Sequence, residues 1–82
     1  MSLAKNELMD NLDKIHTTEL GVKRIKKNLN LDTNDVIVWC KDNIKNASDI
    51  FKKGKNWYVQ AKDCTITINV HSFTIITAHK KK

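Results

Sequence analysis

The 82-residue sequence has no proline, only two glycines and two cysteines, and it has no long hydrophobic run. The cysteines lack a CxxC partner and the three histidines are scattered, so no ligand spacing for a zinc site is present. No apolar run approaches the ~20 residues that a transmembrane helix needs, so we expect no membrane partner. Ser–His–Asp and paired-carboxylate spacings are also missing. The sequence therefore predicts neither a metal ion nor a cofactor.

What is present is the composition of an ordinary globular domain, with 40% hydrophobic and 29% charged residues. The chain is too short for two hydrophobic cores, so we expect one domain over residues 1–82. No export signal opens it, and we expect a cytoplasmic protein. Cys40 and Cys64 are then predicted to be reduced, buried thiols.

The segment 56–80 is rich in Ile, Val, Thr and aromatic residues and alternates apolar with polar side chains. A period of two is typical of half-buried strands. Tight turns at Lys62-Asp63 and His71-Ser72 would place the apolar residues on one side of a sheet. This inward set is Trp57, Val59, Ala61, Cys64, Ile66, Ile68, Val70, Phe73 and Ile75. The other face would carry Tyr58, Gln60, Thr65, Thr67, Asn69, Thr74, Ile76, Ala78 and Lys80.

The region before this segment has helical periodicity over about residues 5–15, 18–29 and 33–45. Thr17 or Thr18 is expected to cap the second helix, and Asp32 or Thr33 the third. With strands over about 49–53, 56–61, 64–70 and 73–80, the order predicts an α+β domain. Three N-terminal helices would pack on one face of a four-stranded antiparallel meander.

The second helix is expected to turn its apolar side chains inward. These are Leu20, Val22, Ile25 and Leu29. Gly21 lies among them and costs about 1 kcal/mol relative to alanine in a helix. Its presence indicates a close backbone contact at that position.

Positive charge is concentrated in two segments of a chain whose net charge is +6. Residues 20–31 contain four basic residues and no acid, and residues 51–82 contain seven lysines against Asp63. This distribution is typical of a surface that binds polyanions, although lysine is also ordinary solubilising surface. The predicted nucleic-acid contacts are Lys23, Arg24, Lys26, Lys27, Lys53, Lys55 and Lys80.

Four residues are candidates for catalysis or direct recognition. His16, at the joint of two helices, suits proton transfer, or alternatively bonds a carbonyl at a helix end. Arg24 is the only arginine and could clamp a phosphate or form an ion pair with an acid such as Asp35. Tyr58 stands on a sheet face that is either merely solvated or able to stack on bases. His79 lies near the end of the last strand.

Three strings carry a resemblance to a known family: HTTELGVKRIKKNL (16–29), KGKNWYV (53–59) and ITINVHSFTIITAHK (66–80). They closely resemble an uncharacterised bacterial family, domain of unknown function 3781, which implies no activity. A basic helix, a short acidic helix and a meander are more loosely similar to the ribonuclease toxins of the RelE, colicin and barnase type. That likeness implies His16, Arg24, Tyr58, Thr77 and His79 as catalytic candidates.

Two classes of function follow. The first is a non-enzymatic interaction module with a basic surface, whose partner is RNA, another polyanion, a second copy or another protein. The alternative is a metal-independent ribonuclease, with His16 or His79 as acid or base and Arg24 as phosphate clamp. An enzyme needs these groups close together. It therefore predicts that the His16 joint meets Thr77 and His79 at one rim of the sheet.

Overall fold

Three helices and then four strands follow one another along the chain, as the hydrophobic periodicity predicts. The computed structural model describes residues 3–31 and 35–80. The elements are α1 (Leu3–Asp10), a short 3-10 turn η1 (Leu12–Lys14), α2 (Glu19–Leu29), α3 (Val36–Lys45), β1 (Asp49–Lys53), β2 (Asn56–Gln60), β3 (Cys64–Asn69) and β4 (Ile75–Lys80). The strands form an antiparallel sheet in the order β1-β2-β3-β4. The predicted α+β class and meander are confirmed.

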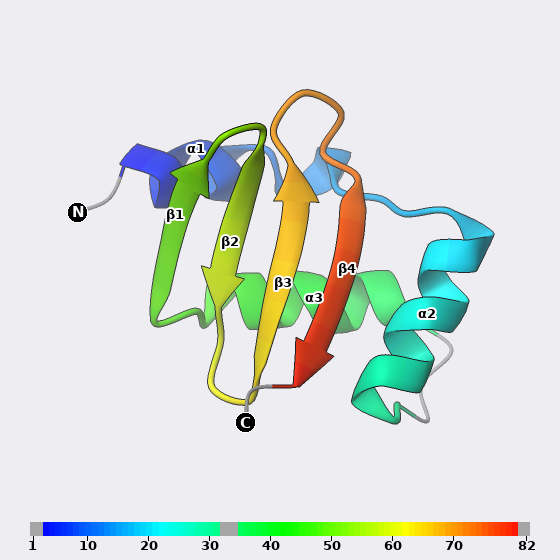
Figure 1. Ribbon diagram of the computed structural model, residues 1–82. Coiled ribbons are helices and arrows are strands. Elements are labelled where there is room, and N and C mark those ends of the chain that lie inside the picture. The colour runs from blue at the N-terminus through cyan, green and yellow to red at the C-terminus, as the bar shows by residue number, and fades with distance from the viewer. Residues whose placement is uncertain (1–2, 32–34, 81–82) are drawn as a thin grey trace.

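The helices cover one face of the sheet and one of its sides (Figure 1). α1 and α3 lie behind the sheet, whereas α2 stands beside β4. All three helices were expected on one face of the sheet. α2 differs from this expectation, because it packs beside β4. The opposite face of the sheet has no helix over it (Figure 1).

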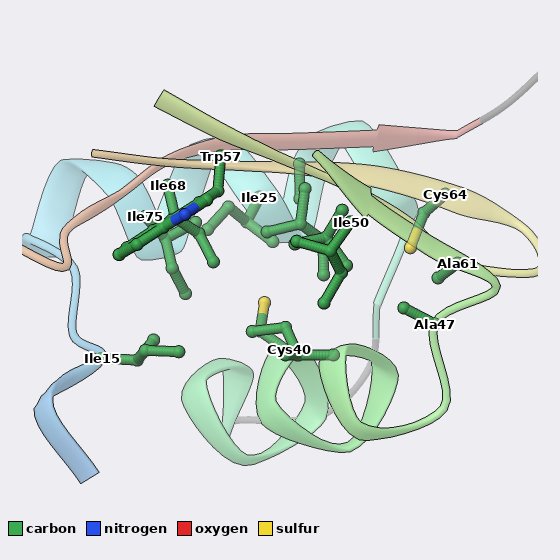
Figure 2. Close-up of a cluster of buried hydrophobic side chains, with 14 of the residues drawn as sticks. Ile15, Ile25, Cys40, Ala47, Ile50, Trp57, Ala61, Cys64, Ile68 and Ile75 are labelled. Atoms are coloured by element: carbon green, nitrogen blue, oxygen red, sulfur yellow. The ribbon is translucent and has the colours of Figure 1, made fainter. Parts of the chain in front are cut away.

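The core lies between the sheet and α3, as Figure 2 shows. Cys40 points from α3 toward the sheet, where Trp57, Ile68 and Ile75 are buried. Seven of the nine residues in the predicted inward set are buried, and Phe73 and Val70 are half-buried. Val70 is only half-buried, because β3 ends at Asn69 and Val70 begins the following loop.

Both thiols lie in this core, Cys40 on α3 and Cys64 at the start of β3, and no disulfide joins them. Burial, and to a smaller extent the nearby Cys64, raises the pKa of the Cys40 thiol from 9.0 to about 12. Cys40 is therefore a protonated, apolar packing group at neutral pH. This agrees with the predicted burial of both cysteines.

The start of α2 is built around Gly21. Thr18 caps the helix, and its hydroxyl accepts a hydrogen bond from the Gly21 N–H at 3.0 Å. A Cβ at Gly21 would collide with the Thr17 hydroxyl, so the close contact expected at this glycine is confirmed. The buried residues are Gly21, Ile25 and Leu29, spaced four apart, and Leu20 is consequently 70% exposed. The expectation that Leu20 faces inward is wrong.

The helix boundaries differ from the predicted ones at two places. The first helix ends at Asp10, where the Asn11 side chain donates to the Glu7 carbonyl at 2.7 Å, and η1 follows. α3 begins at Val36, and the caps predicted at Asp32 or Thr33 lie outside the described residues.

β4 contains one extra residue, which changes the faces of its second half. Ile75 pairs with Ile68, but Thr77 pairs with Thr67, so Ile76 has no partner in β3. A bulge of this kind shifts the register by one residue and turns each later side chain over. The predicted positions of Ala78 and Lys80 on the open face are therefore wrong. Ala78 is fully buried opposite Ile66, Lys80 is opposite Cys64, and His79 comes to the open face opposite Thr65.

The β3–β4 loop also differs from the predicted two-residue turn. Asn69 and Thr74 close the hairpin, as the predicted register requires, since the Asn69 N–H donates to the Thr74 carbonyl. The Asn69 side-chain oxygen accepts from the N–H groups of His71 and Ser72. Phe73 has a φ of 58°, a left-handed conformation that ends the four-residue loop.

Candidate functional site

The open face of the sheet is organised in cross-strand rows, because directly opposite residues project to the same side. The middle row is Phe51, Tyr58, Thr67 and Thr77. The row nearer the β1–β2 turn is Lys53, Asn56 and Asn69, and the row at the other end is Asp49, Gln60, Thr65 and His79. The face therefore combines aromatic, hydroxyl and amide groups with few charges.

Phe51 and Tyr58 form a stacked aromatic pair on this face. Their ring centroids are 5.5 Å apart with an interplanar angle of 23°. Phe51 is 41% exposed, which is unusual for a phenylalanine. It is exposed because no helix lies over this face of the sheet. The two rings and Lys53 line an open depression of about 320 Å³. A flat aromatic surface beside an ammonium group can take a planar ring that carries a nearby negative charge.

Phe51 is the functional candidate that the sequence interpretation missed. A tight turn at Gly54-Lys55, between the predicted strands 49–53 and 56–61, is sufficient to find it. That turn places Lys53 opposite Asn56 and hence Phe51 opposite Tyr58, which is the pairing observed.

α2 joins the open face at its β4 side. The Asn28 side chain donates to the Ala78 carbonyl at 3.3 Å and lies 3.5 Å from the Thr77 hydroxyl. Arg24 is one helical turn before Asn28 and therefore on the same side of α2. It is exposed, and the alternative of an ion pair with an acid such as Asp35 stays a prediction.

The His16 side chain is held at both ring nitrogens. Nδ1 lies 2.9 Å from the Lys14 carbonyl and Nε2 lies 3.1 Å from the Thr74 hydroxyl. Because a carbonyl can only accept, Nδ1 carries the proton in this arrangement. The backbone of His16 also exchanges hydrogen bonds with Phe73 and Ile75. His16 thus ties the connection between α1 and α2 to the start of β4, which fits the structural alternative for this residue.

His16 and His79 lie at opposite ends of β4. His16 bridges to Thr74, just before the strand, and His79 is five residues farther on. At about 3.3 Å per residue the two sites are roughly 16 Å apart. The expectation that they meet at one rim of the sheet is therefore wrong. The catalytic roles of His16, Arg24, Tyr58 and His79 stay predictions.

The predicted lysine contacts are distributed over several surfaces. Lys53 lies at the aromatic depression and Lys55 in the β1–β2 turn. Lys23 and Lys27 are exposed on α2, while Lys26 is half-buried. Lys80 is exposed at the end of β4. Only Lys53 touches the aromatic pair's depression.

Neither a metal centre nor a membrane span is found in the described part of the chain. No group of three or more His, Cys, Asp or Glu side chains in residues 3–31 and 35–80 could hold a metal ion. No helix there is long and apolar enough to cross a membrane.

A model of the family DUF3781, described as a protein of unknown function, matches residues 9–79. The chain belongs to this family. No curated protein and no solved structure gives a match. The DUF3781 match covers both the helices and the sheet, so the open face is part of the family domain. The looser similarity to ribonuclease toxins has no counterpart among these comparisons.

Proposed function

We propose that this DUF3781 domain is a non-enzymatic module that binds single-stranded RNA on the open face of its sheet. The observation that carries the proposal is the stacked Phe51–Tyr58 pair, in which Phe51 is exposed and Tyr58 half-buried, with Lys53 beside it. Proteins that bind unpaired nucleotides commonly stack bases on aromatic side chains that project from a sheet, with basic groups near the phosphates.

The proposal specifies a single strand because the bases of a duplex are already stacked and paired. An exposed ring can take the face of a base only when that base is unpaired. The net charge of +6 supports attraction to the phosphates. Stacking contributes roughly 1–3 kcal/mol per base when tested by alanine substitution.

The direct test is fluorescence anisotropy with labelled single-stranded RNA, single-stranded DNA and duplex RNA of equal length at low salt. Phe51→Ala and Tyr58→Ala should each weaken single-strand binding by roughly 5- to 150-fold, the equivalent of that stacking energy. Val38→Ala is the matched control, because Val38 is an exposed apolar residue on α3, in the other layer. It should bind as the parent does.

Three results would contradict the proposal. Equal affinities for the aromatic variants and the Val38→Ala control would leave the rings without a role. Duplex binding as tight as single-strand binding would indicate a purely electrostatic contact. No binding at low salt would remove nucleic acid as the ligand and leave a protein-binding module.

The ribonuclease alternative has weaker support. His16 is engaged at both ring nitrogens, and it lies at the far end of β4 from His79. An RNA-cleavage assay without added metal tests it. Cleavage that disappears in both His16→Ala and Arg24→Ala would favour the enzyme over the binding module.

A further inference from the structure

The middle row of the open face leads from the aromatic pair directly to α2. Phe51, Tyr58, Thr67 and Thr77 are successive partners on four neighbouring strands. With about 4.8 Å between strands, the row spans roughly 14 Å. The row has no acidic residue, since the carboxylate of Asp49 lies in the neighbouring row. Asn28 extends it onto the helix through its contacts with Thr77 and Ala78.

One side of α2 faces the end of this row. Leu20, Arg24 and Asn28 are four residues apart and therefore lie above one another on the helix surface. Asn28 contacts β4, and Arg24 and Leu20 are exposed along the same side. The buried stripe of Ile25 and Leu29 points instead into the core. Lys27 is exposed next to this side, three residues after Arg24.

We infer that the bound strand crosses the sheet, from the Phe51–Tyr58 pair to Arg24 and Lys27 on α2, which bind its phosphates. This inference rests on the proposed function and adds the direction of the ligand and its second contact. Arginine presents a planar fork of donors that matches phosphate oxygens, and Arg24 is exposed on α2. Between the two ends, the half-buried Thr77 hydroxyl and the exposed Asn28 amide provide neutral contacts for sugar and phosphate oxygens, whereas Thr67 is buried.

The alternative path runs along the strands, past Lys53 and Lys55 at the β1–β2 turn. It uses the same aromatic pair but no residue of α2. The two paths differ in the length of RNA that they need. A strand that reaches α2 must span about 14 Å of sheet and a further ~10 Å to the outer side of the helix. We expect this to require at least about four nucleotides, the lower end of known single-strand site sizes.

A length series of RNA decides between the paths. Binding of oligonucleotides from two to eight nucleotides is measured at fixed salt by NMR shift titration, in the parent and in the double variant Arg24→Ala/Lys27→Ala. The matched control is Lys41→Ala/Lys45→Ala, which also removes two positive charges but from α3. The melting temperature of each variant shows that it is folded.

If the RNA strand crosses the sheet, the Arg24→Ala/Lys27→Ala variant should bind RNA of six and eight nucleotides at least about tenfold more weakly than the parent. Each good phosphate contact contributes of the order of a charge-assisted hydrogen bond, so the fold-change follows from two such contacts. For RNA of two nucleotides, the loss of affinity should equal that of the Lys41→Ala/Lys45→Ala control. Amide shifts on α2 should appear only with the longer ligands.

A loss independent of length, or one equal to that of the control, would overturn the crossing path. The two proposals fail in distinguishable ways. Phe51→Ala without effect defeats the binding function itself. A large effect of Phe51→Ala together with no specific effect of Arg24→Ala/Lys27→Ala defeats only the path.

Discussion

Ala78 lies directly opposite Ile66, and both side chains are fully buried. This pairing exists only because Ile76 is an extra residue in β4. With the uninterrupted register, Ala78 would stand on the open face and His79 would point toward the helices. The bulge therefore decides which residues of the last strand can meet a ligand.

Enlarging the buried alanine tests this register. Ala78→Leu should lower the free energy of unfolding by about 1–3 kcal/mol, because extra methyl groups do not fit a packed core. Urea denaturation measures the change. Ile76→Ala is the control, since Ile76 is 42% exposed and its replacement should change stability much less. Equal tolerance at both positions would contradict the bulged pairing.

Adding a methyl group at Gly21 should destabilise the protein, although alanine is the better helix former by about 1 kcal/mol. The new Cβ would meet the Thr17 hydroxyl, which donates to the Ile75 carbonyl at 3.0 Å. Thermal melting should show a lower midpoint for Gly21→Ala. Combining it with Thr17→Ala should cost less than the sum of the two single changes, because the clash is then absent. Simple additivity, or a stabilised Gly21→Ala, would argue against the contact.

Stability should fall with rising pH in the alkaline range because of Cys40. Its pKa is raised from 9.0 to about 12 in the folded protein. Below pH 9 the thiol is protonated in both states, and its contribution to stability is fully present. Between about 9 and 12 the unfolded chain loses this proton first, so the native state binds more protons and the free energy of unfolding decreases. Denaturation curves at several pH values measure the slope.

The control for this slope is Cys40→Ala. The variant should be less stable at every pH but show a shallower decline above pH 9, because the Cys40 thiol no longer contributes to the slope. Thiol labelling gives a second measurement. Cys40 should react with a thiol reagent at the rate of unfolding, and rapid labelling of the native protein would contradict its burial.

Salt should weaken RNA binding through counterion release. The logarithm of the affinity should fall linearly with the logarithm of the salt concentration. Arg24→Ala and Lys53→Ala should each reduce the slope by about 1, as expected for the loss of one phosphate contact. Lys45→Ala on α3 should leave the slope unchanged, and a uniform reduction in all three variants would indicate a diffuse charge effect instead.

The sequence was sufficient for most of the sheet but not for its last strand. Trp57 opposite Ile68 follows from alternation on both strands and a short turn between them, which leaves only one register with all apolar residues inside. Ile75-Ile76 gives no such alternation, because two adjacent apolar residues fit either face. Where the pattern is ambiguous, packing against Ile66 and α2 decides, and these contacts lie far away in the sequence.

The candidate site was predictable in part for the same reason. Tyr58 was placed on the open face by local alternation. His16 was not, because its partner Thr74 is 58 residues away and the bond depends on how the helices meet the sheet. The two hydrogen bonds of its ring show that a histidine between two helices can connect parts of the fold instead of donating a proton to a substrate.

The position of α2 also determines how this domain can meet other chains. At one end the Thr17 hydroxyl donates to the Ile75 carbonyl, and at the other the Asn28 amide donates to the Ala78 carbonyl. Acceptors on the outer edge of β4 are thereby taken, and a strand from another molecule cannot add there. Two copies that joined their sheets would have to use β1, the other edge strand. α2, which completes the proposed RNA surface, thus also prevents a further strand from pairing with β4.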